Sequence, residues 1–259
     1  MRLTHCSIKA DFELTAAVLA DFHSSAKARS KAGLKKTLEV IGEVQPDIIL
    51  STGDIFNSTD SRSVKSRHNI KGFELLRGVR QTAPVYLSIG NHEHTISSGN
   101  RSMLEEAGIC VLDHEFVRYR DIVIGGLTSG FVYEKAYYKG KQPIPDVSML
   151  ERFAAESGYK ILLCHHPEYW RKYIAGRGID LTVSGHAHGG QWGFFGGRGV
   201  YAPGQGLFPK YVRGLHHFIS GGKKETLAVS RGMTNTQPIP RFFNPCEILI
   251  LHFVNDGKV

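Results

Sequence analysis

The chain has 259 residues, of which 41% are hydrophobic and 22% are charged. This length and balance predict a folded α/β protein and exclude both a small disulfide-stapled scaffold and a wholly disordered chain. Lys and Arg number 32 against 24 Asp and Glu, and the net charge of +8 favours anionic partners such as phosphate esters. No run approaches the roughly 18 apolar residues that a membrane span needs, so no transmembrane segment is expected.

The four cysteines lie far apart, at positions 6, 110, 164 and 246. This spacing is typical neither of a disulfide framework nor of a thiolate zinc site. The segment Met1–Leu14 carries charges through its middle, unlike the apolar core of a signal peptide. We therefore expect a soluble, cytoplasmic protein.

Predicted strands and helices alternate along the first half of the chain. Thr15–Ala20 is a short apolar run typical of a buried strand, and Lys31–Val44 has apolar residues at helical spacing. Strands at Asp47–Leu50 and Val85–Ile89 then enclose a helix at Ile70–Val79. This alternation predicts right-handed βαβ units and a mostly parallel sheet.

The second half contains shorter predicted segments. One helix is expected at Val147–Glu156, and the strands are Phe116–Tyr119, Asp121–Ile124, Tyr159–Cys164, Leu181–Ser184, Leu227–Ser230 and Glu247–Phe253. Glycine and aromatic residues gather in Gly189–Phe208, which predicts a long loop over a site. Neither a repeat nor a linker interrupts the chain, so we expect a single domain over residues 1–259.

Five of the predicted strands end in short polar clusters. The clusters are Asp21-Phe22-His23, Gly53-Asp54, Gly90-Asn91-His92-Glu93, His165-His166-Pro167 and Gly185-His186-Ala187-His188. Because the carboxyl ends of strands in an open α/β sheet converge, we expect these side chains to meet in one crevice. Oxygen ligands mixed with imidazoles, without thiolates, suit Mn, Fe, Zn or Co better than Ca or Mg. Singly, such residues also cap helices, but all five clusters in order are far more specific.

This set of clusters resembles the calcineurin-like metallophosphoesterases. The Gly-Gly-Gln after His188 is similar to the bacterial phosphodiesterase branch, as are the later Gly-Leu-Phe-Pro-Lys-Tyr, Val-Ser-Arg-Gly and Pro-Arg-Phe-Phe segments. The resemblance runs from about Thr15 to Phe253. It implies a four-layer α/β-β/α sandwich with a binuclear metal centre at the carboxyl ends of the strands.

The resemblance also implies a role for each cluster. The two implied ligand sets are Asp21, His23, Asp54 and His188 for one metal, and Asp54, Asn91, His165 and His186 for the other. Asp54 would therefore bridge the two ions. His166 is the alternative to His165, which we prefer because the family's ligand lies two residues before a proline. His92 would stay free of metal and protonate the leaving group as general acid.

Some residues near these clusters depart from the family or stay open. The usual Gly-Asp-x-x-Asp ends here in Asn57, which would hold His92 without a charge. Glu93 is expected either to orient His92 or to be a solvated loop residue. Trp192, Phe194 and Phe195 would offer a lipid, nucleobase or partner contact if they are exposed.

The implied activity is hydrolysis of phosphodiester or pyrophosphate bonds. Two divalent transition metal ions, with Mn favoured over Fe, Zn and Co, would clamp the phosphoryl group while a bridging hydroxide attacks it. A phosphomonoesterase with the same site is the main alternative, followed by a nuclease and a non-catalytic scaffold. The expected partner is a small anionic phosphoester. No nucleic-acid module is recognised in the sequence, and peripheral membrane contact is compatible with it.

Overall fold

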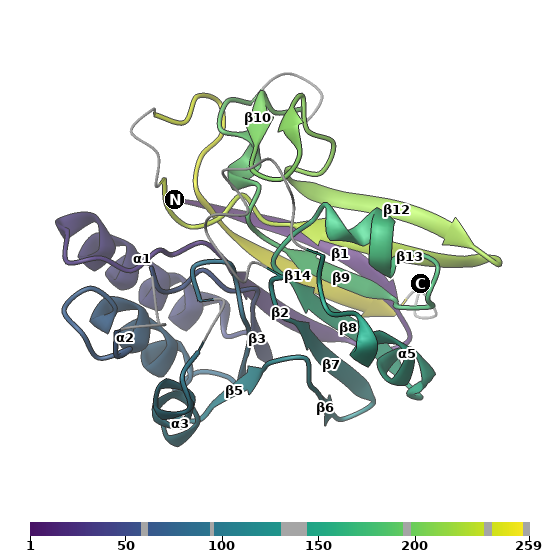
Figure 1. Cartoon of the computed structure of the whole chain (residues 1–259), viewed down its shortest axis with the longest axis horizontal. Coiled ribbons are helices and arrows are strands. Elements are labelled where there is room, and N and C mark those ends of the chain that lie inside the picture. The colour runs from purple at the N-terminus through teal and green to yellow at the C-terminus, as the bar shows by residue number, and fades with distance from the viewer. Residues whose placement is uncertain (58–61, 94–95, 131–143, 194–197, 236–239, 256–259) are drawn as a thin grey trace.

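Two six-stranded sheets form the centre of the computed structural model (Figure 1). The structure describes residues 1–57, 62–93, 96–130, 144–193, 198–235 and 240–255. In spatial order, the first sheet contains β1 (Arg2–Ala10), β14 (Glu247–Asn255), β2 (Leu14–Leu19), β3 (Ile48–Ser51), β4 (Val85–Ser88) and β5 (Ile109–Leu112). The second contains β12 (Gly214–Ser220), β13 (Lys223–Val229), β9 (Leu181–Ser184), β8 (Tyr159–Cys164), β7 (Ile122–Leu127) and β6 (Phe116–Tyr119).

Most neighbouring strands run parallel, as the sequence predicts. In the first sheet β2, β3, β4 and β5 are parallel, and β14 joins them antiparallel to β2. In the second sheet β13, β9, β8 and β7 are parallel, with antiparallel β12 and β6 at the two edges. The carboxyl ends of four neighbouring strands are therefore collected at one edge of each sheet.

Helices cover the outer face of each sheet and complete the four-layer α/β-β/α sandwich. The helices α1 (Ala28–Val44), α2 (Ile70–Val79) and α3 (Ser98–Glu106) pack on the first sheet. The second sheet is covered by α5 (Ser148–Ala155) and a π-helical turn, Trp170–Ile174. The fold class predicted from the sequence is confirmed.

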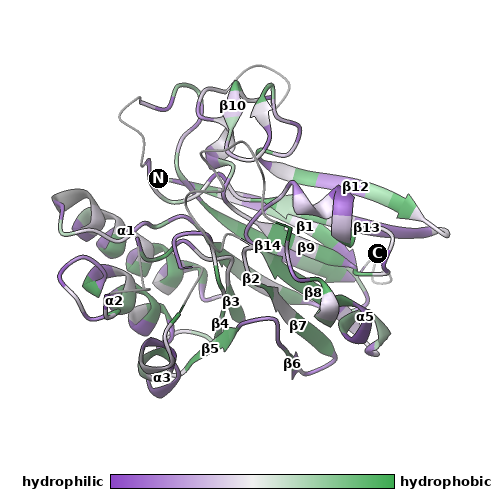
Figure 2. Cartoon of the chain, viewed as in Figure 1, coloured by the Kyte–Doolittle hydropathy of each residue, from purple (hydrophilic) through white to green (hydrophobic). Residues whose placement is uncertain are grey.

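Alternation along the strands explains the layers. Successive strand side chains point to opposite faces, so Ala17 and Leu19 face the helices while Ala16 and Val18 face the other sheet. The central strands β2, β3, β4, β7, β8 and β9 are buried on both faces and form the most hydrophobic part of the molecule (Figure 2). The core between the sheets draws residues from both halves of the chain, which supports our proposal of a single domain.

The segment Gly189–Phe208 is more ordered locally than the predicted loop. Its described part includes the end of a 3-10 turn at His188–Gly190 and a small antiparallel pair, β10 (Tyr201–Ala202) and β11 (Gly206–Leu207). Phe194 and Phe195 lie outside the described residues. No helix in the described parts of the chain has both the length and the apolar character to cross a bilayer.

The two sheets touch where β7 passes the end of β5. A Cβ atom at Gly126 would lie 2.4 Å from the Leu112 carbonyl oxygen and 2.5 Å from the Leu112 Cβ. We therefore expect Gly126→Ala to lower the free energy of unfolding by about 1–3 kcal/mol, because the sheets must separate locally. Denaturant unfolding measures this.

The matched control is Gly42→Ala in α1, where no described atom lies within 4 Å of the new methyl group. Alanine stabilises a helix interior relative to glycine, so this variant should gain about 0.5–1 kcal/mol. Equal effects of the two substitutions would contradict the close contact between the sheets.

Candidate metal centre

The polar clusters predicted from the sequence follow the carboxyl ends of strands in both sheets. In the first sheet Asp21, Asp54 and Asn91 follow β2, β3 and β4. In the second sheet His165 and His186 follow β8 and β9. The sandwich brings these ends together, so residues 165 positions apart in sequence contact one another, as the His186 amide does with Asp21 Oδ2 at 3.1 Å.

Two groups of potential ligand atoms lie side by side. The atoms offered by Asp21, His23 and His188 are within 4.8 Å of one another, and so are those offered by Asp54, His165 and His186. Asp21 Oδ1 lies 3.8 Å from Nε2 of both His23 and His188.

Asp54 is a member of the second group and also lies close to His23 of the first. Its Oδ2 lies 3.2 Å from His165 Nε2 and 3.7 Å from His23 Nε2. All six side chains of the two groups are buried. The carboxylate of Asp54 is therefore the point at which the two groups meet.

The backbone of this region is strained. Five of its residues have positive φ angles, namely Asp21 (54°), His23 (46°), Asp54 (54°), His186 (62°) and His188 (47°). Residues other than glycine seldom adopt such angles, which cost on the order of 1–3 kcal/mol each. Strain of this kind persists where the surroundings fix it, and it gathers at functional sites.

Glycines let the backbone approach both aspartates. A Cβ at Gly90 would lie 2.2 Å from Asp54 Oδ1, and one at Gly232 would lie 2.7 Å from Asp21 Oδ2. The next amide after Asn91, that of His92, donates to Asp54 Oδ1 at 2.9 Å. Asn91 therefore sits directly beside Asp54, with its Oδ1 buried.

Glu93 differs from both sequence expectations, because it neither contacts His92 through its carboxylate nor faces solvent. It is fully buried, and Oε2 accepts hydrogen bonds from the amides of Asp54 (2.9 Å) and Gly90 (3.1 Å). Its Oε1 accepts from the amides of Ile55 (2.7 Å) and Phe56 (2.9 Å). Glu93 thus fixes the loop that carries Asp54.

His165 presents its Nε2 toward the metal centre. Its Nδ1 lies 3.0 Å from the carbonyl oxygen of Thr52. A carbonyl only accepts, so Nδ1 donates, and Nε2 is the ring nitrogen that faces Asp54. Such outer contacts commonly orient histidine ligands.

His166, the alternative to His165, points elsewhere. Its Nε2 lies 2.6 Å from Ser129 Oγ, and its Nδ1 lies 3.2 Å from Glu168 Oε1. It belongs to a further group with Glu168 and His186, which shares His186 with the group of Asp54 and His165. This geometry favours His165 as the partner of Asp54.

His92 is the exposed member of the site. Its Nδ1 lies 3.2 Å from the carbonyl oxygen of Asn57 and donates to it, while its ring meets that of His23 edge to face at 4.7 Å. The Asn57 side chain donates instead to the Ser24 carbonyl at 2.5 Å. Asn57 therefore contacts His92 without a charge, as expected, but through its backbone carbonyl and not through its side chain. His92 can also form a ligand group with His23 and Asp54.

Arg241 contacts the site and was not singled out from the sequence, although it lies in the Pro-Arg-Phe-Phe segment. Its Nη2 lies 3.0 Å from His188 Nδ1, and its Nη1 donates to the Arg231 carbonyl at 2.6 Å. Asn244 Nδ2 donates to the His188 carbonyl at 2.7 Å. These two side chains fix the loop around His188.

Burial and neighbouring charges shift the pKa values of the aspartates and histidines of the site. Burial alone would raise the pKa of Asp54, but the charges of His165 and His92 hold it well below its usual range. Burial lowers the pKa of His165, yet Asp54 outweighs it and raises that pKa to about 9. Burial lowers the pKa of His23 to about 3 and raises the pKa of Asp21 to about 6.

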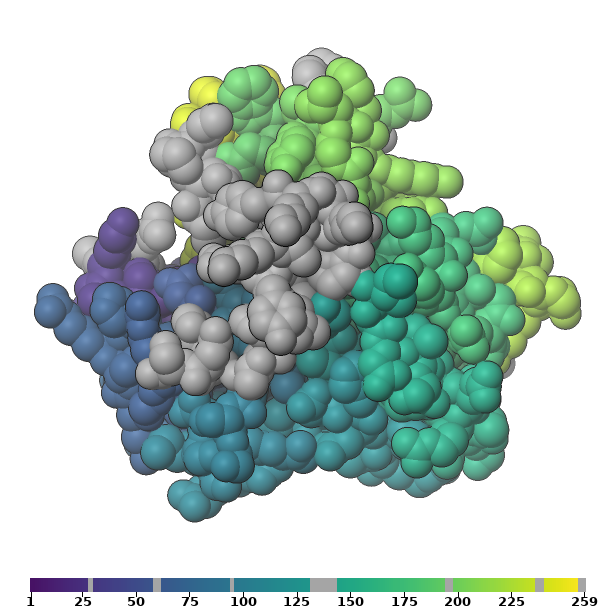
Figure 3. Space-filling view, viewed as in Figure 1, coloured from purple at the N-terminus to yellow at the C-terminus, as the bar shows by residue number. Residues whose placement is uncertain are grey.

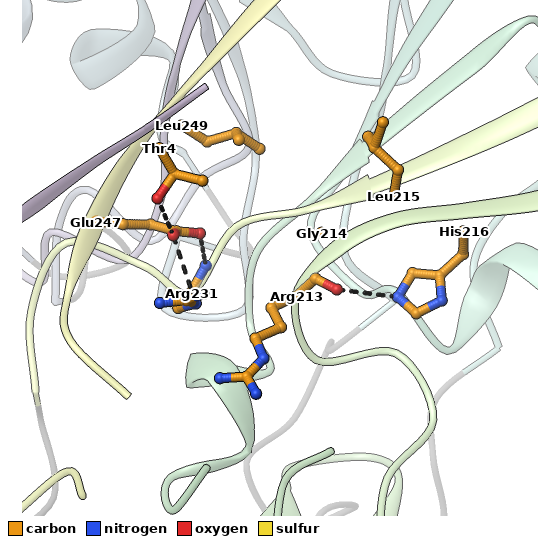
Figure 4. A pocket seen from close by; sticks show the side chains of 8 residues that line it. All are labelled: Thr4, Arg213, Gly214, Leu215, His216, Arg231, Glu247 and Leu249. Carbon is orange, nitrogen blue, oxygen red and sulfur yellow. Dashed lines mark hydrogen bonds and ion pairs between the residues drawn. The ribbon is translucent and has the colours of Figure 1, made fainter. Parts of the chain in front are cut away.

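A cavity of about 380 Å³ opens next to this region, between β1, β14 and β12 (Figure 4). Arg213 and Arg231 line it, and Glu247 Oε2 accepts from Thr4 Oγ1 at 2.8 Å and lies 3.4 Å from Arg231 Nε. The carbonyl of Arg231 accepts from Arg241, whose Nη2 lies 3.0 Å from His188 Nδ1, so two side-chain contacts separate this lining residue of the cavity from His188.

The donor set fits divalent cations. Both ring nitrogens of His23 and Nε2 of His165 and His186 are buried and have no hydrogen-bond partner among the described residues. Burying such atoms without a partner is costly, and a cation would satisfy them together with the two carboxylates. Imidazole and carboxylate ligands suit transition metals such as Mn, Fe and Zn.

Comparison with known proteins shows the family to which this fold and donor set belong. The family model of the calcineurin-like phosphoesterases matches residues 14–190, and the chain belongs to this family. An uncharacterized metallophosphoesterase of Helicobacter pylori is 28% identical over 71% of this chain and 46% of its own length. One of Campylobacter jejuni is 26% identical over 95% of this chain and 60% of its own. The chain thus spans about half the length of these relatives.

A solved structure shows the same fold. NAD nucleotidase of Haemophilus influenzae superposes with a TM-score of 0.55 and 15% identity, over 86% of this chain and 51% of that protein. The likeness concerns the architecture of the two sheets and their helices.

The four amides bound by Glu93 generate a prediction. Glutamine keeps one acceptor oxygen and turns an amide group toward two backbone donors, so Glu93→Gln should lower the free energy of unfolding by about 2–4 kcal/mol. Thermal or denaturant unfolding measures the loss.

Glu105→Gln is the control, because Glu105 makes an exposed ion pair with Arg101 and its loss should cost less than about 1 kcal/mol. If both substitutions cost the same, Glu93 does not fix the Asp54 loop.

Proposed function

We propose that this protein is a binuclear metal-dependent phosphoesterase that hydrolyses phosphodiester or pyrophosphate bonds. The observation that carries the proposal is the pair of buried ligand groups meeting at Asp54. Membership of the calcineurin-like phosphoesterase family supports it. The natural partner would be a small anionic phosphoester.

In this proposal each metal has four ligands, and the two sets share Asp54. One set is Asp21, His23, Asp54 and His188, and the other is Asp54, Asn91, His165 and His186. Manganese is our choice among the transition metals. When bound, two such cations supply Lewis-acid activation of water and of the phosphoryl group. The four free cysteines support a cytoplasmic location.

The chain's own residues would position these groups and handle one proton. Glu93 fixes the loop that carries Asp54, Gly90 leaves room for the Asp54 carboxylate, and Thr52 orients His165. The exposed ring of His92, anchored through Nδ1, leaves Nε2 to donate a proton to the departing alkoxide. An alkoxide is a poor leaving group unless it is protonated, so this proton donation would speed diester cleavage.

The direct test compares two chromogenic esters. The purified chain is stripped of metal, reloaded with Mn²⁺ and assayed on bis-nitrophenyl phosphate and nitrophenyl phosphate. We expect metal-dependent turnover that is faster on the diester. Faster turnover of the monoester would keep the metal centre but make the protein a phosphatase. No metal-dependent turnover of either would favour the non-catalytic scaffold.

A substitution tests the role of His92. His92→Ala should slow hydrolysis on the order of a hundredfold or more, because the general acid is lost while both ligand sets remain. The loss should shrink for esters with good leaving groups such as nitrophenol and grow for alkyl esters.

Metal content, measured by plasma mass spectrometry, should be unchanged in His92→Ala. His217→Ala, an exposed histidine on β12, is the control and should match the parent. Equal losses for good and poor leaving groups would remove His92 from the acid role, and a loss of metal would make it a ligand.

A further inference from the structure

Large apolar side chains gather on the loops beside the metal centre. We call the described residues 191–193, 198–213 and 240–243 the apolar lobe; it includes β10 and β11 at the top of Figure 1. The exposed fractions of its apolar side chains are 40% for Trp192, 46% for Tyr201, 70% for Leu207, 76% for Phe208, 53% for Phe242 and 89% for Phe243. Contiguous apolar exposure of this kind marks an interaction surface.

Backbone pairing makes these residues one surface. Trp192 and Phe242 form a β-bridge, with their rings 5.9 Å apart. The Val200 amide donates to the Trp192 carbonyl at 3.1 Å, and the Phe208 amide donates to the Val200 carbonyl at 2.8 Å. Tyr201 pairs with Leu207. Figure 3 shows residues 198–213 of the lobe, in green, at the top of the molecule.

Two of the phenylalanines are held outward against their backbone preference. Phe208 has φ 52° and Phe243 has φ 49°, in the left-handed region that bulky residues disfavour. Neither side chain gains burial in return. A chain that keeps strained phenylalanines in solvent suggests that they contact something outside the protein.

The charges of the lobe are all positive. From Leu181 to Cys246 the sequence has a single acidic residue, Glu225, which accepts the amides of Gly176 and Gly178 outside the lobe. Within the lobe Arg198 and Lys210 are exposed. Arg213 lines the cavity of Figure 4 and lies under Gly193, where a Cβ would be 3.1 Å from its Nη1.

We propose that the apolar lobe docks on an anionic phospholipid bilayer. Its aromatic and leucine side chains would enter the interfacial region, while the exposed Arg198 and Lys210 would lie among the lipid phosphates. Two copies joined through this lobe would bring like charges together.

The strained backbone supplies a selective variant. Asparagine tolerates positive φ better than phenylalanine, so the double variant Phe208→Asn, Phe243→Asn should melt at or above the parent's temperature. It should also retain the parent's activity on bis-nitrophenyl phosphate, because neither residue belongs to the ligand groups. Ile219→Asn is the matched control, since Ile219 is 71% exposed on β12 outside the lobe.

The experiment is co-sedimentation of the full chain with phospholipid vesicles. We expect the parent and Ile219→Asn to bind vesicles of phosphatidylcholine with phosphatidylglycerol, and to bind phosphatidylcholine alone more weakly. Raising the salt from about 0.1 M to about 0.5 M should weaken binding, because the charges are screened. The double variant should bind these vesicles at least about tenfold more weakly than the parent.

Four results would overturn the proposal. The parent could fail to bind either vesicle, or Ile219→Asn could lose as much binding as the double variant. The parent could instead leave vesicles unbound and bind a single-stranded oligonucleotide through Phe208 and Phe243. It could likewise leave vesicles unbound and form a dimer through these two residues, which light scattering would detect. Because sedimentation involves no turnover, these results are independent of the proposed phosphoesterase activity.

Discussion

The carboxylate of Asp54 is the interaction on which the rest of the site depends. It lies at the end of a strand of the first sheet, yet its nearest ring is His165 from the second sheet, 3.2 Å away. Its loop is fixed by Glu93, and Gly90 leaves room for its oxygen. Without this shared charge, the buried imidazoles on both sides would lose the carboxylate that connects them. The sandwich is thus the means by which two sheets deliver ligands to one point.

Much of this arrangement could be predicted from the sequence because its signals are local. Short apolar runs such as Tyr159–Cys164 form buried parallel strands, and a polar residue directly after such a run lies at the carboxyl end of the sheet. The grouping of Asp21 with His188, and of Asp54 with His165, followed from that rule together with the family resemblance. The four-layer architecture followed in the same way.

The elements that the sequence did not reveal depend on distant partners. β1 has mostly exposed side chains, and it is a strand because Arg2 to Ala10 pair with Glu247 to Asn255 at the sheet edge. The role of Glu93 depends on four amides that only the folded loops bring together. Arg241 reaches His188 across 53 positions, and nothing in its own segment indicates that contact. Such roles arise from loop geometry, which residue patterns do not encode.

The most direct test of the central claim is a crystal structure of the chain loaded with Mn²⁺, with an anomalous difference map recorded at a wavelength where manganese scatters. Our account predicts two peaks, one among Asp21, His23 and His188 and the other among Asn91, His165 and His186, with Asp54 contacting both. A single peak, or a peak bound by His166 and Glu168 in place of His165, would contradict the proposed sharing of Asp54.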